Sequence, residues 1–81
     1  MGTTVADLKE WFERGQKEKA THMIVVCDTF DHEDYPVYTK TDDDCRAKYR
    51  APGEMQRVME VYDLGADKAA QMAAVRAFSL P

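Results

Sequence analysis

The sequence predicts an α+β domain in which three helices pack on a small, mainly antiparallel three-stranded sheet. Segments with helical periodicity and segments rich in β-branched and aromatic residues follow one another in the order α-β-β-α-β-α. The two consecutive strand-like segments are separated by only a short polar break, as in a hairpin. A chain of 81 residues builds one small core, so a single domain over residues 1–81 is expected.

The first helix is expected to begin after Thr4 and to end at Gly15. Thr4 can cap it, and Asp7 stands three residues later, at the second position of a capping box. Leu8 and Phe12 lie on one face at helical spacing and predict an amphipathic helix that packs on the sheet. Glycine is the usual residue at a helix end.

Two strands are expected on either side of the acidic break DHED, residues 31–34. Residues 21–30, THMIVVCDTF, are apolar on both parities, which is typical of a central strand. Residues 35–40, YPVYTK, continue with aromatic and β-branched side chains. Pro36 has no N–H to donate, so this second strand is expected at a sheet edge.

A short second helix is expected over residues 41–50, TDDDCRAKYR. Thr41 can cap it, acidic residues crowd its first turn and basic residues its last, as the helix dipole favours.

Residues 54–65, EMQRVMEVYDLG, fit a helix and a strand about equally well. Neither strand parity is clean, because Arg57 interrupts one face and Glu60 the other. We predict a strand, with a helix as the alternative, because a hairpin alone is marginal in water. The long connection lets this strand lie beside the first, giving the sheet order 2-1-3. The apolar residues that also fit helical spacing are Met55, Val58, Met59 and Tyr62.

Residues 66–81, ADKAAQMAAVRAFSLP, are expected to form a closing helix with Asp67 near its start and Pro81 at its end. Alanines occur on two faces. One face would pack on the sheet, and the other would be either the seam of a homodimer or a plain solvent-facing surface.

Composition excludes several classes of protein. With 44% hydrophobic and 32% charged residues, the chain is expected to be soluble and globular. It has no apolar run near the roughly 20 residues of a spanning helix and no secretory signal, so a cytoplasmic location without membrane contact is expected. The net charge of −4 disfavours nucleic acid as a partner.

The stretch CDTFDHEDYP, residues 27–36, carries one thiol, one imidazole and four carboxylates. A calcium loop of the EF-hand type would need a glycine in its body, which is missing. His22 and Cys27 are five residues apart in one strand, so their side chains leave opposite faces and do not share a zinc ion. A magnesium or manganese site, built from Asp28, Asp31 and Asp34 with residues 42–44, stays open as an alternative.

No nucleotide-binding or hydrolase motif is present, and no catalytic residue, cofactor or resident metal is expected. The two cysteines are expected to be reduced thiols. Cys27 has an apolar, core-like setting. Cys45, at a helix start, is the better candidate for a reactive thiolate, although the aspartates at 42–44 oppose that.

From VADLKEWF through THMIVVCDTFDHEDYPVY to MQRVMEVYDL, most of the chain resembles small α+β proteins of phages, prophages and bacteria that have no known activity. The resemblance implies no catalytic or binding residues. It favours an accessory factor that binds a host protein or a defence component.

We therefore expect a non-enzymatic interaction or regulatory protein whose partner is a basic protein or a second copy of itself. Exposed acids beside aromatic residues suit a basic protein surface. A divalent-metal-dependent enzyme or metal-binding module, and a small-molecule or nucleotide sequestering protein, are the alternatives. The residues expected to contact the partner are Phe30, Asp31, His32, Glu33, Asp34, Tyr35 and Tyr38.

Overall fold

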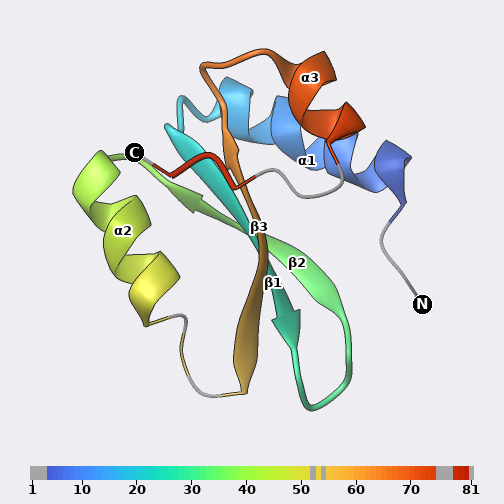
Figure 1. The fold of residues 1–81 in the computed structure, drawn as a ribbon, viewed down its shortest axis with the longest axis vertical. Helices are drawn as coiled ribbons and strands as arrows, with labels where there is room; N and C mark the ends of the chain where they lie inside the picture. Colours follow the sequence, from blue (N-terminus) through green and yellow to red (C-terminus); the bar gives the residue numbers. More distant parts are fainter. Residues whose placement is uncertain (1–3, 52, 54, 75–77, 81) are drawn as a thin grey trace.

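The computed structural model describes residues 4–51, 53, 55–74 and 78–80 (Figure 1). The three strands form one antiparallel sheet in the order β2-β1-β3, so the predicted fold class and strand order are confirmed. The radius of gyration, 11.7 Å, is the value expected for a compact chain of this length. The elements are α1 (Val5–Lys17), β1 (His22–Asp28), β2 (Asp34–Thr39), α2 (Asp42–Arg50), β3 (Gln56–Asp63) and α3 (Lys68–Ala73).

Helix α1 begins as predicted, with both hydrogen bonds of the capping box between Thr4 and Asp7. The predicted end at Gly15 is wrong, because the helix runs on to Lys17. It stops in a Schellman arrangement, in which Lys19 is left-handed (φ 59°) and the N–H of Ala20 donates to the Gly15 carbonyl at 3.0 Å. A lysine therefore takes the position that usually belongs to glycine.

Gly15 instead provides room for packing. A Cβ atom at this position would lie 2.7 Å from Leu64 Cδ1 and 2.8 Å from Tyr38 Cε1. The Tyr38 hydroxyl also donates to the Trp11 carbonyl at 2.6 Å, which fixes the ring against α1. The glycine thus sets how closely α1 approaches the sheet.

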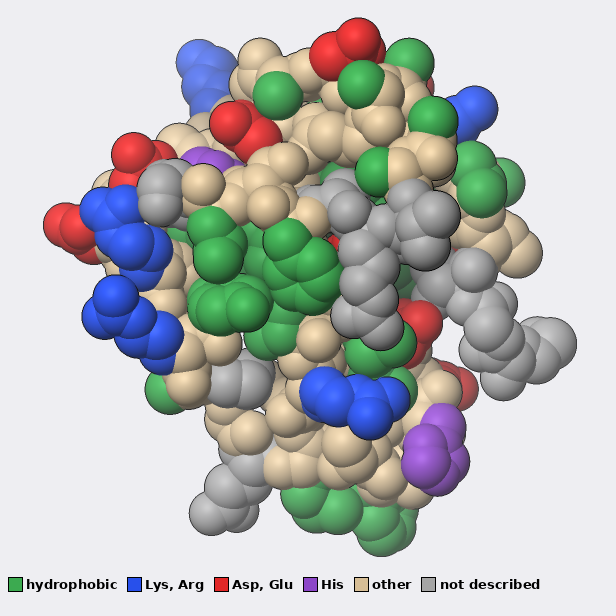
Figure 2. All heavy atoms as spheres, viewed as in Figure 1, with side chains coloured by type: hydrophobic (Ala, Val, Ile, Leu, Met, Phe, Trp, Pro, Cys, Tyr) green, Lys and Arg blue, Asp and Glu red, His purple; other side chains and the backbone are tan. Residues whose placement is uncertain are grey.

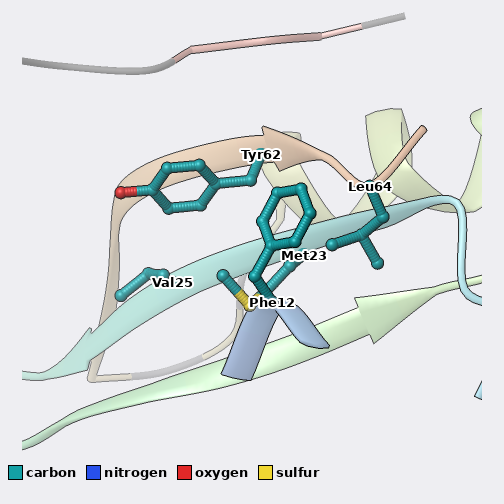
Figure 3. Close-up of a cluster of buried hydrophobic side chains, with 5 residues drawn as sticks. All are labelled: Phe12, Met23, Val25, Tyr62 and Leu64. Atoms are coloured by element: carbon teal, nitrogen blue, oxygen red, sulfur yellow. The ribbon is translucent and has the colours of Figure 1, made fainter. Parts of the chain in front are cut away.

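The sheet has apolar side chains on both faces because β1 lies at its centre. Helices α1 and α3 lie together on one side, and α2 lies on the other (Figure 1). We call these sides the α1 face and the α2 face. The core of the α1 face, shown in Figure 3, is Phe12, Met23, Val25, Tyr62 and Leu64. The core of the α2 face is Ile24, Val26, Cys45 and Val61.

A β-bulge in β3 explains why its sequence resembled a helix. Val25 is opposite Glu60 while Val26 is opposite Val58, so Met59 is an extra residue. The bulge puts Met59 on the α1 face with its core and leaves Val58 and Val61, three residues apart, on the α2 face. Spacing of three residues across a bulge imitates the period of a helix.

The predicted closing helix is too long. Helix α3 ends at Ala73, and Ala74 is already extended (ψ 144°). Residues 78–80 are not helical, and the Ser79 N–H donates to the Val61 carbonyl of β3 at 3.0 Å. Phe78 meets the ring of Tyr49 edge to face at 6.2 Å. These tertiary contacts outweigh the helix propensity of the alanines. Residues 75–77 and 81 lie outside the described residues.

Candidate functional site

The turn between β1 and β2 is organised by its own carboxylates. Oδ1 of Asp28 accepts from the Phe30 N–H at 2.8 Å, and Oδ1 of Asp31 accepts from the Glu33 N–H at 3.1 Å. His32 is left-handed (φ 60°), and its N–H donates to the Asp28 carbonyl at 2.7 Å. Two of the acids therefore have a structural role in the turn. Asp31, His32 and Glu33 also point their side chains into solvent.

Two large apolar side chains lie in solvent at this end of the molecule. Phe30 is 77% exposed and Met55 is 54% exposed. The Thr29 N–H donates to the Met55 carbonyl at 2.7 Å, so the hairpin turn and the start of β3 are adjacent. Figure 2 shows hydrophobic side chains at the lower end of the view, where these segments lie in Figure 1. We call Phe30, Asp31, His32, Glu33 and Met55 the tip patch.

Met55 was not among the residues predicted for this site. Its backbone is left-handed (φ 58°), which is uncommon for a residue with a side chain, and that side chain gains little burial in return. The sequence indicated the position of Met55 only indirectly, through the predicted strand order. A sheet order of 2-1-3 with an antiparallel third strand puts the start of β3 beside the end of β1.

The structure does not bring the other predicted contact residues to the tip patch. Tyr38 is opposite Met23 and packs on the α1 face, where burial raises the pKa of its phenol. Tyr35 is opposite Val26 and packs on the α2 face. Asp34 is opposite Cys27 and interacts with its thiol. Side chains three residues apart in one strand point to opposite faces of the sheet. Tyr35 and Tyr38 therefore could not belong to one contact surface.

Both thiols are free and buried, on opposite faces of the sheet. Burial raises the pKa of Cys27, and the carboxylate of Asp34 raises it further. Burial also raises the pKa of Cys45, although the buried Thr39 hydroxyl partly offsets this. That hydroxyl has no hydrogen-bond partner of ordinary geometry among the described residues. Asp42 and Asp44 also raise the pKa of Cys45, in the direction expected from the sequence.

In the part of the chain that the structure describes, no three His, Cys, Asp or Glu side chains are close enough to hold a metal ion. The carboxylates suggested for magnesium or manganese are spread between the hairpin turn and the start of α2. Within the same residues, no helix is both long and apolar enough to span a membrane. Comparison of the chain with protein-family models, curated proteins and solved structures gives no match.

Proposed function

We propose that this protein is a non-enzymatic interaction protein that binds a basic protein through the tip patch. The observation that supports this most directly is the exposure of Phe30 and Met55 at one end of the sheet, on two segments joined by the hydrogen bond from the Thr29 N–H to the Met55 carbonyl. Single exposed apolar residues are ordinary, whereas large apolar side chains that gather at one end of a molecule favour a contact surface.

The charges around this pair suit a basic partner. Asp31 and Glu33 are exposed carboxylates beside Phe30, and the whole chain carries a net charge of −4. An apolar centre with a charged rim is the usual anatomy of a protein interface. The carboxylates would increase the rate of association with a positively charged surface, and the apolar pair would supply most of the affinity.

A cytoplasmic host protein, bound by an accessory factor of the phage or prophage kind, is the partner we favour. A second copy of the chain is a further proposed partner, with α3 at the seam. Ala69, Ala70 and Ala73 are exposed on α3, and small side chains of this kind allow two helices to approach closely.

The test uses three matched double variants as bait in affinity capture from the source cell, read by mass spectrometry. Phe30→Ser with Met55→Ser removes the apolar pair. Asp31→Asn with Glu33→Gln removes two charges and keeps the oxygen that accepts in the turn. The control, Asp42→Asn with Asp44→Asn, removes two charges at the start of α2.

We expect at least one basic protein to be retained by the wild type and by the control, and to be lost by both tip variants. With that protein purified, the apolar variant should bind about tenfold more weakly or worse. The charge variant should associate more slowly and depend less on salt. Capture of the same proteins by all four baits would contradict the proposal.

A further inference from the structure

A second exposed apolar surface lies where the last turn of α2 meets residues 78–80. The side chains of Tyr49, Phe78 and Leu80 are 37%, 40% and 42% exposed. The rings of Tyr49 and Phe78 meet edge to face with their centroids 6.2 Å apart, and Leu80 is two residues after Phe78. We call these three residues the aromatic patch. Figure 2 shows hydrophobic side chains gathered left of centre, where α2 and the end of the chain approach each other in Figure 1.

The aromatic patch is held in place by the backbone on both of its sides. The Ser79 N–H donates to the Val61 carbonyl of β3 at 3.0 Å, which fixes the two residues next to Ser79 against the sheet. Tyr49 is positioned by α2, because Cys45, one turn earlier on the same side of the helix, is fully buried. Side chains that are ordered before binding lose little conformational entropy when a partner contacts them. Large apolar side chains that are fixed and yet left in solvent favour a contact surface.

Basic side chains border the aromatic patch. Arg46 and Arg50 are four residues apart on α2 and therefore lie on one side of the helix, with Tyr49 three residues after Arg46. Arg50 is exposed and makes no ion pair with any described residue. Arg46 pairs with Asp43, whose side chain is 96% exposed, and a surface pair of this kind contributes little. Both guanidinium groups are thus available to the carboxylates of a partner.

The acidic residues of α2 lie at the other end of the helix. The aspartates at 42–44 are in the first turn, whereas Lys48 and Arg50 are in the last. At about 1.5 Å per residue, Tyr49 is about 7–11 Å along the axis from these aspartates. The aromatic patch therefore presents positive charge beside its rings, in a chain whose net charge is −4. Charge complementarity indicates an acidic partner for this surface.

We propose that the aromatic patch binds an acidic segment of a partner protein. An aliphatic or aromatic side chain of that segment lies against the aromatic patch, and its carboxylates lie at Arg46 and Arg50, whose guanidinium groups suit carboxylates. Single-stranded nucleic acid also stacks on aromatic rings beside cations, but the aspartates at 42–44 would repel its continuous row of phosphates. The aromatic patch has a charge opposite to that of the tip patch and does not depend on the function proposed there.

The test is a titration of ¹⁵N-labelled protein followed by amide NMR. The probe is a short synthetic peptide in which two leucine-phenylalanine pairs lie between glutamates. One control peptide has serines in place of the apolar pairs, and the other has lysines in place of the glutamates. We expect the probe to give saturable shifts in the last turn of α2 and at residues 78–80, with a Kd of about 1 mM or tighter. Both control peptides should bind at least about tenfold more weakly, and raising the salt from about 50 to about 500 mM should weaken binding of the probe.

Two kinds of variant separate the role of charge from that of apolar contact. Arg46→Gln with Arg50→Gln should weaken binding of the probe about tenfold and reduce its salt dependence. Leu80→Ser should weaken binding to a similar extent and leave the salt dependence unchanged. Arg14→Gln with Lys17→Gln is the matched charge control, because it also removes one paired and one exposed cation, but from α1. This control should bind the probe as the wild type does.

Val5→Ser is the matched apolar control, because Val5 is 54% exposed and lies on α1. It should not change binding. Tyr49→Phe keeps the ring and should retain most of the affinity. Circular dichroism identifies any variant that fails to fold. Arg50→Gln alone changes one exposed side chain, where folding is least at risk, and it should still weaken binding measurably.

Four results would overturn the proposal. One is the absence of saturable shifts up to about 10 mM probe, a concentration well above the expected Kd. Another is equal affinity for the probe in the wild type and in the variant without both arginines. The third is a set of shifts confined to another region, such as the tip patch or the groove between α1 and α3. The fourth is tighter binding of a single-stranded oligothymidylate than of the probe at the aromatic patch, which would make nucleic acid the partner.

Discussion

Cys45 lies in the first turn of α2, where the helix dipole lowers the pKa of a thiol, yet its pKa is raised. Desolvation is the largest cause, because the side chain is fully buried among Ile24, Val26 and Val61. The acidic residues of the same turn, Asp42 and Asp44, add to it. At the scale of the residue, the environment of the side chain therefore outweighs its position in the helix.

This raised pKa predicts a loss of stability at alkaline pH. A thiol ionises near its ordinary value of 9.0 in the unfolded chain, but the folded protein keeps Cys45 protonated to higher pH. The contribution of Cys45 to the free energy of unfolding is complete below pH 9 and is lost as the pH rises from there towards the pKa of Cys45 in the folded protein. Urea titrations from pH 7 to 10.5 should show the free energy of unfolding falling only above about pH 9.

Cys45→Ala separates this effect from other alkaline titrations. The variant should lose about 1–2 kcal/mol at pH 7, through the cavity it leaves, and should show a shallower fall above pH 9 than the wild type. Cys27, whose pKa is also raised from 9.0, is present in both proteins, as are Tyr38 and Tyr62, whose raised pKa values start from a higher ordinary value of 10.0. If the free energy of unfolding fell equally with pH in the two proteins, Cys45 would not contribute to the loss of stability at alkaline pH.

At the scale of the elements, the contact between α1 and the sheet depends on the absence of a side chain at Gly15. Leu64 is buried, and the hydroxyl of Tyr38 is held by the Trp11 carbonyl, so neither can easily make room for a Cβ at Gly15. Alanine in place of a helical glycine normally stabilises by about 1 kcal/mol. At Gly15 the steric overlap of the added Cβ with Leu64 and Tyr38 should outweigh this gain, because overpacking a core typically costs about 1–3 kcal/mol.

We therefore expect Gly15→Ala to lower the free energy of unfolding by about 1–2 kcal/mol in a urea titration. Gly65→Ala is the matched control, because a Cβ there would meet only Asp63 Oδ1 at 3.4 Å, an ordinary contact. That variant should change stability by less than about 0.5 kcal/mol. A stabilised Gly15→Ala protein would mean that Gly15 affects only helix propensity.

For the whole molecule, α3 lies beside α1 on the same side of the sheet (Figure 1). The groove between these helices has an open volume of about 380 Å³ and includes Val5, which is 54% exposed. Burying this groove and the exposed alanines of α3 against a second copy would remove apolar surface from water. This arrangement is the reason for proposing a second copy as a partner.

Light scattering tests that prediction. The wild type should have twice the mass of one chain at high concentration and should dissociate on dilution. Ala70→Glu puts a charge on the exposed face of α3 and should give a monomer at every concentration. Ala47→Glu makes the same change on exposed α2 and should leave the dimer intact. A wild type that is monomeric throughout would remove the second copy as a partner.

The features that the sequence alone could predict are those made by residues close together in the chain. Thr4 and Thr41 each cap a helix by accepting a hydrogen bond from the backbone N–H three residues later. The apolar composition of the first strand predicted its position at the centre of the sheet. The acidic hairpin turn was also predictable, because the Asx hydrogen bonds that hold it are local. These interactions need no knowledge of the rest of the fold.

Contacts between distant segments decided the rest. The bulge at Met59 sets which side chains of β3 face each core, and the close approach of Leu64 explains why position 15 is a glycine although α1 continues past it. Residues 78–80 are not helical, because Ser79 forms a hydrogen bond with β3. Met55 joins Phe30 only because β3 starts where β1 ends. Local sequence sets hydrogen bonds and periodicity, whereas packing across the sheet depends on residues whose separation in the chain gives no local signal.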